Sequence, residues 1–180
     1  MEKLVWLAAK EGSASTLKAL LSSGPFVKGN WKNPDDYGST ALHRGCEFAD
    51  GEIVSILLGH PGIDPNQKDN WGITPFYMAC VGGRTACVRL FLKDPRVNLN
   101  ECHSGGFTPL REAASSNHLE IVQWWIASGR DMDLGEPGDD KTDAIKVATS
   151  SGSHDVASLL QRFRENPEET RQAVRRELGI

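Results

Sequence analysis

The stretch Gly72-Ile73-Thr74-Pro75-Phe76-Tyr77 decides the fold, because it recurs along the chain at a fixed spacing. It returns 34 residues later as Gly106-Phe107-Thr108-Pro109-Leu110-Arg111, and it is preceded 34 residues earlier by Gly38-Ser39-Thr40-Ala41-Leu42-His43. A weaker copy starts at Asp140, with Thr142 in the threonine position. Self-similarity at such a period is the signature of a repeat architecture.

A second apolar pattern follows the same period downstream. Val54, Val88, Val122 and Val156 lie 34 residues apart, and so do Leu57, Phe91, Trp125 and Leu159. In an earlier copy Leu17, Leu20 and Leu21 precede Val54, Leu57 and Leu58 by 37 residues. One register therefore fits five copies.

Each copy predicts two short helices and a loop. The threonine can cap a helix through its hydroxyl group, and the proline that follows suits the first helical turn. Small residues such as Ala113-Ala114 predict close contact with a neighbouring unit, and Val88, Phe91 and Leu92 form one apolar face at helical spacing. Loops such as 60–66 are rich in Pro, Gly, Asp and Asn, which favour turns.

These motifs resemble the ankyrin-repeat family over roughly residues 1–160. The resemblance implies an all-α solenoid of helix-turn-helix units with hairpin-like fingers, in units of about 1–34, 35–68, 69–102, 103–136 and 137–160. Only His43 retains the family histidine of the motif, which Tyr77, Arg111 and Ile145 replace. Residues 161–180 predict a C-terminal capping helix, with Asn166 as N-cap, Pro167 in the first turn and Gly179 at the end. Its apolar face holds Val174 and Leu178.

Composition excludes several classes of function. Twenty Lys and Arg against 24 Asp and Glu give a net charge of −4, which argues against nucleic-acid binding. The sequence has no apolar run of membrane-spanning length and no recognisable signal peptide, so we expect the chain in the cytosol or the nucleus, away from membranes. We also expect a monomer. Cys46 and Cys80 lie in apolar helical patterns, and we expect the four cysteines to form neither disulfides nor a metal site.

No catalytic constellation is recognisable, and we expect neither a catalytic residue nor a cofactor. The five histidines are scattered, and the resemblance gives His43 and His118 structural roles in the turns. An enzyme using the adjacent Cys102 and His103 remains an alternative, although neighbouring residues rarely face each other.

The resemblance implies that another protein or peptide binds in a concave groove formed by the finger tips and the first helices. Aromatic residues on consecutive exposed fingers are typical of binding surfaces. The alternative for Trp71 is that its ring lies flat on a neighbouring finger, whereas Trp124 is expected on the convex side. The predicted binding residues are Tyr37, Trp71, Ile73, Phe107, Arg44, Phe48, Met78, Glu112 and Ser115.

Two further properties of the family lead to separate hypotheses. Some ankyrin arrays read methylated lysine through an aromatic cage, for which Trp31, Tyr37, Trp71, Asp69 and Glu47 have suitable side chains. Ankyrin arrays are also substrates of an asparaginyl hydroxylase, and Asn66 and Asn100 occupy the finger position on which it acts. The alternative is that both amides only brace their turns.

Overall fold

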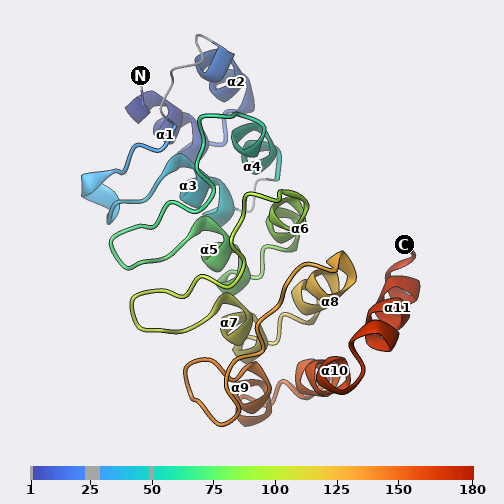
Figure 1. Ribbon diagram of the computed structural model, residues 1–180. Helices are drawn as coiled ribbons and strands as arrows, with labels where there is room; N and C mark the ends of the chain where they lie inside the picture. The colour runs from blue at the N-terminus through green and yellow to red at the C-terminus, as the bar shows by residue number, and fades with distance from the viewer. Residues whose placement is uncertain (1, 23–28, 49–50) are drawn as a thin grey trace.

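The structure, a computed structural model, describes residues 2–22, 29–48 and 51–180. The chain forms consecutive helix pairs that stack in two layers, and one more helix follows at the C-terminal end (Figure 1). The first helices of the pairs stack on one another in one layer, and the second helices do so in the other. Within the described ranges the backbone is helical or irregular, apart from one isolated bridge between Asn33 and Ser39. The predicted all-α repeat solenoid is confirmed.

The helices are short, as the sequence pattern predicts. The first helices of the units are α1 (Glu2–Lys10), α3 (Ala41–Glu47), α5 (Pro75–Val81), α7 (Pro109–Ser115) and α9 (Ala144–Ser150). The second helices are α2 (Ala14–Ser22), α4 (Gly51–Leu58), α6 (Thr85–Lys93), α8 (Leu119–Ser128) and α10 (His154–Glu165). A single 3-10 turn, η1 (Pro34–Asp36), precedes α3, and α11 (Pro167–Leu178) follows α10.

The threonines of the repeated motif begin the first helices. The hydroxyl oxygens of Thr74 and Thr108 accept hydrogen bonds from the backbone N–H groups three residues later. At Thr40 a hydrogen bond runs in the opposite direction: the backbone N–H group of Thr40 donates to the ring of His43, three residues later. These caps satisfy donors that a helix start leaves free.

The fifth unit departs from the register predicted for it. Asp143, not Thr142, is the N-cap of α9, and its carboxylate accepts from the Lys146 N–H group. Lys146 therefore occupies the histidine position that the sequence register assigned to Ile145. The preceding loop is one residue longer than the period of 34 requires, and Asp caps a helix as well as Thr does.

The seam between units is built from small residues. Ala79 and Cys80 of α5, and Ala113 and Ala114 of α7, are completely buried. Small residues also allow the two helices of one unit to pack closely, because a Cβ atom added to Gly45 of α3 would lie only 3.0 Å from a methyl carbon of Ile53 in α4. All four cysteines are free. Burial raises the pKa of Cys46, which keeps its thiol protonated.

Arginines satisfy carbonyl groups at the C-terminal ends of three second helices, α4, α6 and α8. Arg96 donates to the carbonyl oxygen of Leu58 at the end of α4, and Arg130 donates to that of Leu92 at the end of α6. At the end of α8 the donors come from α11: its Arg171 and Arg175 donate to carbonyl oxygens in the last turn of α8. Cationic donors at helix C-termini satisfy free carbonyls and oppose the negative end of the helix dipole.

The C-terminal helix α11 packs against α8 and α10 through Thr170 and Val174, both buried. Gly179 ends the helix with a left-handed conformation (φ 72°), as predicted. Asn166 is at the N-cap position, but its side chain makes no capping hydrogen bond. The boundary drawn at residue 160 lies inside α10, which continues to Glu165.

Candidate binding groove

The loops that precede the first helices are fingers, each closed by a backbone pairing. We call residues 29–40, 59–74 and 94–108 the second, third and fourth fingers, after their units. Within the third finger the Asp69 N–H group donates to the Ile73 carbonyl, and the Asp69 carboxylate accepts from the N–H groups of Trp71 and Ile73 at 2.8 Å each. This arrangement holds Trp71 at the tip of the finger.

Neighbouring fingers are hydrogen-bonded to one another. The Asn70 N–H group donates to the Tyr37 carbonyl oxygen at 2.8 Å, and the Ser104 N–H group donates to that of Trp71 at 3.0 Å. The Tyr37 and Trp71 rings meet at 6.0 Å between centroids with an interplanar angle of 47°. Trp71 nevertheless keeps 59% of its surface exposed, so Tyr37 contacts the ring without covering it.

A hollow of about 580 Å³ lies between the third and fourth fingers and helices α5 and α7. Trp71 and Ile73 line it from the third finger, and Met78 and Val81 line it from α5. Its apolar surface is therefore continuous from the finger tip to the end of α5. Glu47, Arg84 and Glu112 add charged groups to the lining, and Tyr77 and His103 add polar rings.

Two of the charged groups in the hollow have ion-pair partners. Glu47 is paired with Arg44, and Glu112 is paired with Arg111. Arg44 also lies 2.9 Å from an Asp36 carboxylate oxygen. Arg111 therefore balances the charge of Glu112, whereas Arg44 is shared between Glu47 and Asp36.

The rings of Tyr77 and His103 contact each other in the lining of the hollow. Their rings meet edge to face at 5.2 Å, and the His103 Nδ1 atom accepts a hydrogen bond from the Gly105 N–H group. Burial, followed by the nearby Glu112 charge, raises the pKa of Tyr77, so its phenol stays neutral at physiological pH. The alternative catalytic pair therefore has its histidine engaged in a turn, and Cys102 makes no hydrogen bond with His103 within the described ranges.

The structure brings together only part of the predicted binding residues. Trp71, Ile73, Met78 and Glu112 line the hollow. Tyr37 and Phe48 are exposed, at 64% and 55%, but neither lines the hollow, and of the two Tyr37 contacts Trp71.

Three other predicted residues are engaged elsewhere. Phe107 is half-buried, because Arg111 lies over its ring at 4.5 Å and the His103 ring contacts it at 5.1 Å. Arg44 is held by its two carboxylates, and the Ser115 hydroxyl lies 3.3 Å from that of Ser151. Phe107 is therefore less exposed than expected from the sequence, because the Arg111 side chain from the following helix lies over its ring.

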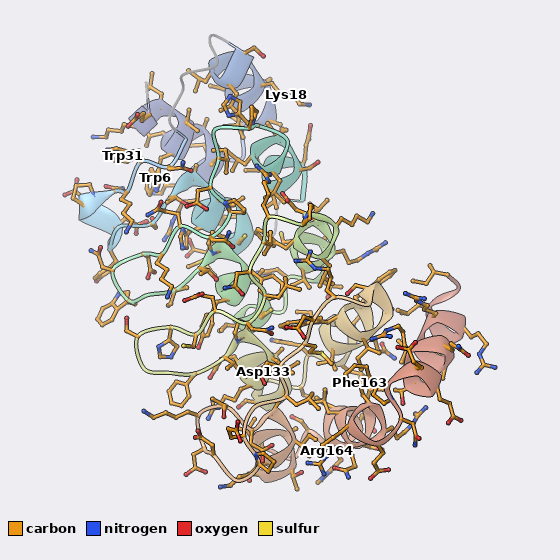
Figure 2. All side chains as sticks on the ribbon, viewed as in Figure 1. Trp6, Lys18, Trp31, Asp133, Phe163 and Arg164 are labelled. Atoms are coloured by element: carbon orange, nitrogen blue, oxygen red, sulfur yellow. The ribbon has the colours of Figure 1, made fainter. Side chains whose placement is uncertain are left out.

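The five residues considered for a methyl-lysine cage do not assemble. Figure 2 shows Trp31 beside Trp6, where the two rings meet edge to face at 6.3 Å. The Asp69 carboxylate is occupied by backbone N–H groups, and Glu47 is paired with Arg44. Only Tyr37 and Trp71 of this set remain together at the surface.

Arg84 and His103 are lining residues that sequence reasoning did not select. Arg84 belongs to the turn between α5 and α6, whereas the groove positions were counted along the first helices. In the sequence, the feature that could have indicated Arg84 is its position three residues after Val81. Only the packed structure shows that its side chain reaches the hollow.

The histidines assigned to turns have the expected roles. The Nε2 atom of His43 lies 2.9 Å from the Ile73 carbonyl oxygen, and that of His118 lies 3.1 Å from the Val81 carbonyl oxygen. Asn66 and Asn100 both brace adjacent fingers. The Asn66 amide donates to the Arg96 carbonyl and accepts from the Asn98 N–H group, and Asn100 accepts from that of Asp133.

Comparison with known proteins agrees with this architecture. The family model for ankyrin repeats (3 copies) matches residues 2–69 and 49–136. The chain therefore belongs to the ankyrin-repeat family, whose repeats are general protein-interaction modules. Osteoclast-stimulating factor 1 of Xenopus laevis is 39% identical over 61 residues, which are 34% of this chain and 27% of that protein.

The described ranges contain no helix long and apolar enough to cross a membrane. They also contain no group of three or more His, Cys, Asp or Glu side chains placed to hold a metal ion.

Proposed function

We propose that this chain is a non-enzymatic interaction module and that a segment of a partner protein binds in the hollow beside Trp71. The observation that carries the proposal is the exposure of Trp71 at the edge of a largely apolar hollow. An exposed apolar patch on a soluble protein is commonly a binding site, and Trp is enriched among residues that dominate binding energy.

The rigidity of the finger supports the same conclusion. Backbone hydrogen bonds join the third finger to the second and the fourth, and the Asp69 carboxylate holds its tip. The finger therefore loses little conformational entropy when a partner covers Trp71, because its backbone is already ordered. Preorganised aromatic residues bind at low entropic cost for this reason.

The test compares Trp71→Ala with Trp124→Ala. Trp124 is half-buried in α8, in the second-helix layer, where the Arg89 guanidinium lies 3.9 Å from its ring centroid. The two changes thus remove the same side chain from opposite sides of the solenoid. A partner is first captured from the source cells with the wild-type chain, and its affinity for each variant is then measured after circular dichroism shows equal folding.

We expect Trp71→Ala to lower the affinity by at least ~2 kcal/mol and Trp124→Ala to leave it nearly unchanged. The reverse pattern would place the binding site on the second-helix layer and refute the groove.

A methyl-lysine reader is the second candidate, favoured by the exposed Tyr37 and Trp71 rings that meet at 6.0 Å. Two adjoining aromatic faces attract a quaternary ammonium group through cation–π interaction. An array of lysine peptides with and without methyl groups tests this candidate. Equal binding of methylated and unmethylated peptides removes it.

A further inference from the structure

Arg84 differs from the other arginines that border the groove. Arg44 and Arg111 each have a glutamate partner, whereas Arg84 forms no ion pair with any residue of the described ranges. Its Nη2 atom donates to the Glu47 backbone carbonyl at 2.9 Å. Its Nε atom is buried without a hydrogen-bond partner, as are those of Arg44 and Arg111, so this feature does not set Arg84 apart. What sets Arg84 apart is a guanidinium whose positive charge faces no carboxylate within the described ranges.

The position of Arg84 is set by the turn that carries it. Gly83 has a positive φ of 65°, and a Cβ atom there would lie 2.6 Å from the His118 ring. His118 in turn contacts the Val81 carbonyl. The next unit thus packs directly on this turn and holds Arg84 at the edge of the hollow, on the same lining as Trp71 and Val81.

The charges around the hollow favour one kind of occupant. Glu47 and Glu112 each have an arginine partner on their own helix, although Arg44 is shared between Glu47 and Asp36, whereas Arg84 is a charged lining residue without an ion pair in the described ranges. A guanidinium presents a planar fork of donors that matches a carboxylate, and partial burial strengthens the attraction. A basic segment would instead meet an unpaired cation as it enters.

We propose that the partner segment places an apolar side chain in the hollow beside Trp71 and an aspartate or glutamate carboxylate on Arg84. This inference rests on the proposed function and adds to it the chemistry of the partner. The apolar contact supplies binding energy, and the carboxylate fixes the position of the segment along the groove.

The probe is a phage-displayed library of random linear peptides, selected on the wild-type chain. Each selected peptide is synthesised with its acidic residue intact and with that residue changed to the matching amide. Both forms are titrated against wild type, Arg84→Gln and Arg84→Lys. Arg89→Gln is the matched control, because Arg89 is an arginine of the neighbouring helix α6 that lies over Trp124 on the opposite layer.

We expect selected peptides to share an apolar residue and an acidic residue at a constant separation. Removing the acid should weaken binding to wild type and to Arg89→Gln by roughly ten-fold or more, and should have little effect on Arg84→Gln. Arg84→Lys keeps the positive charge but not the planar fork of donors, so the loss of affinity on removing the acid should be intermediate between those of wild type and Arg84→Gln. If Arg84→Gln disturbs the turn, the comparison between Arg84→Lys and wild type still measures the coupling.

Two results would overturn the inference in different ways. The role of Arg84 is refuted, and the groove is not, if the selected peptides depend on Trp71 but share no acidic residue. The same conclusion follows if removing the acidic residue weakens binding to Arg84→Gln as much as it weakens binding to wild type. Peptides that bind Trp71→Ala as tightly as wild type refute the groove itself, and so does a failure to select any peptide.

Discussion

The Nε2 atom of His43 lies 2.9 Å from the carbonyl oxygen of Ile73, so a buried ring in the second unit holds the third finger, which lines the groove. The Nδ1 atom of the same ring accepts a hydrogen bond from the Thr40 N–H group at 3.1 Å. A neutral ring with its proton on Nε2 satisfies both contacts. A protonated ring would lose the hydrogen bond from the Thr40 N–H group, because Nδ1 would then carry a hydrogen, for which the Thr40 hydroxyl oxygen at 2.9 Å is an acceptor.

The first prediction concerns pH. Burial lowers the pKa of His43 below its ordinary value of about 6.5, so the unfolded chain binds this proton more readily than the folded chain does. The contribution is fully present above about pH 6.5 and is lost as pH falls towards the folded-state pKa, by at most ~1.4 kcal/mol per pH unit. Urea unfolding of wild type and His43→Gln between about pH 7.5 and pH 5 measures it.

The His43→Gln variant should be less stable at neutral pH and should show a shallower loss on acidification. The remaining histidines are present in both proteins, so the difference between the two slopes isolates His43. Parallel slopes would mean that His43 titrates alike in the folded and unfolded chains.

Arg130 is predicted to be a strong determinant of stability. Its guanidinium donates to the backbone carbonyls of Leu92, Asp94 and Val97, and so joins the end of α6 to two loops. Arg130→Met should lower the free energy of unfolding by roughly 1–3 kcal/mol, because it removes three hydrogen bonds from a charged donor; the Asp94 carbonyl keeps the Val97 N–H group as a donor. Chemical denaturation measures the change. Arg162→Met, on an exposed residue of α10, is the control and should be nearly neutral; equal losses for the two variants would contradict this role.

Ala113 tests the packing between units. It is completely buried in α7, which packs between α5 and α9. Ala113→Leu should lower stability by roughly 1–3 kcal/mol, because the seam has no room for the added carbons. Thermal unfolding measures it, with Ala86→Leu on the exposed face of α6 as the control. An unchanged melting temperature for Ala113→Leu would show that the seam is not closely packed.

Hydroxylation of Asn66 or Asn100 remains a prediction. Both side-chain amides brace neighbouring fingers, and an oxygen added to a side-chain carbon leaves the amide atoms free to keep these hydrogen bonds. Intact-mass analysis after incubation with an asparaginyl hydroxylase should show one added oxygen per modified residue. The variant with both residues changed to Gln is the control, and no gain in mass by the wild-type chain would end the hypothesis.

The sequence by itself determined the repeat and the chemistry of each helix start. Thr74 and Pro75 begin α5 through contacts made within one turn, and the apolar spacing of Val88, Phe91 and Leu92 places these residues in the core. Such features depend on neighbours a few residues away, so they can be read from the order of residues. The same reasoning predicted that Trp71 stands at a finger tip.

Only the tertiary structure decided which side chains share the groove. Trp31 pairs with Trp6, and the turn of Arg84 is held at the hollow by His118 of the next unit. These outcomes depend on contacts between residues far apart in the chain, whose geometry is set by how successive units pack and which no periodicity encodes. Two other outcomes are local and still escaped the periodicity: Arg111 lies over Phe107, and Asp143 rather than Thr142 caps α9.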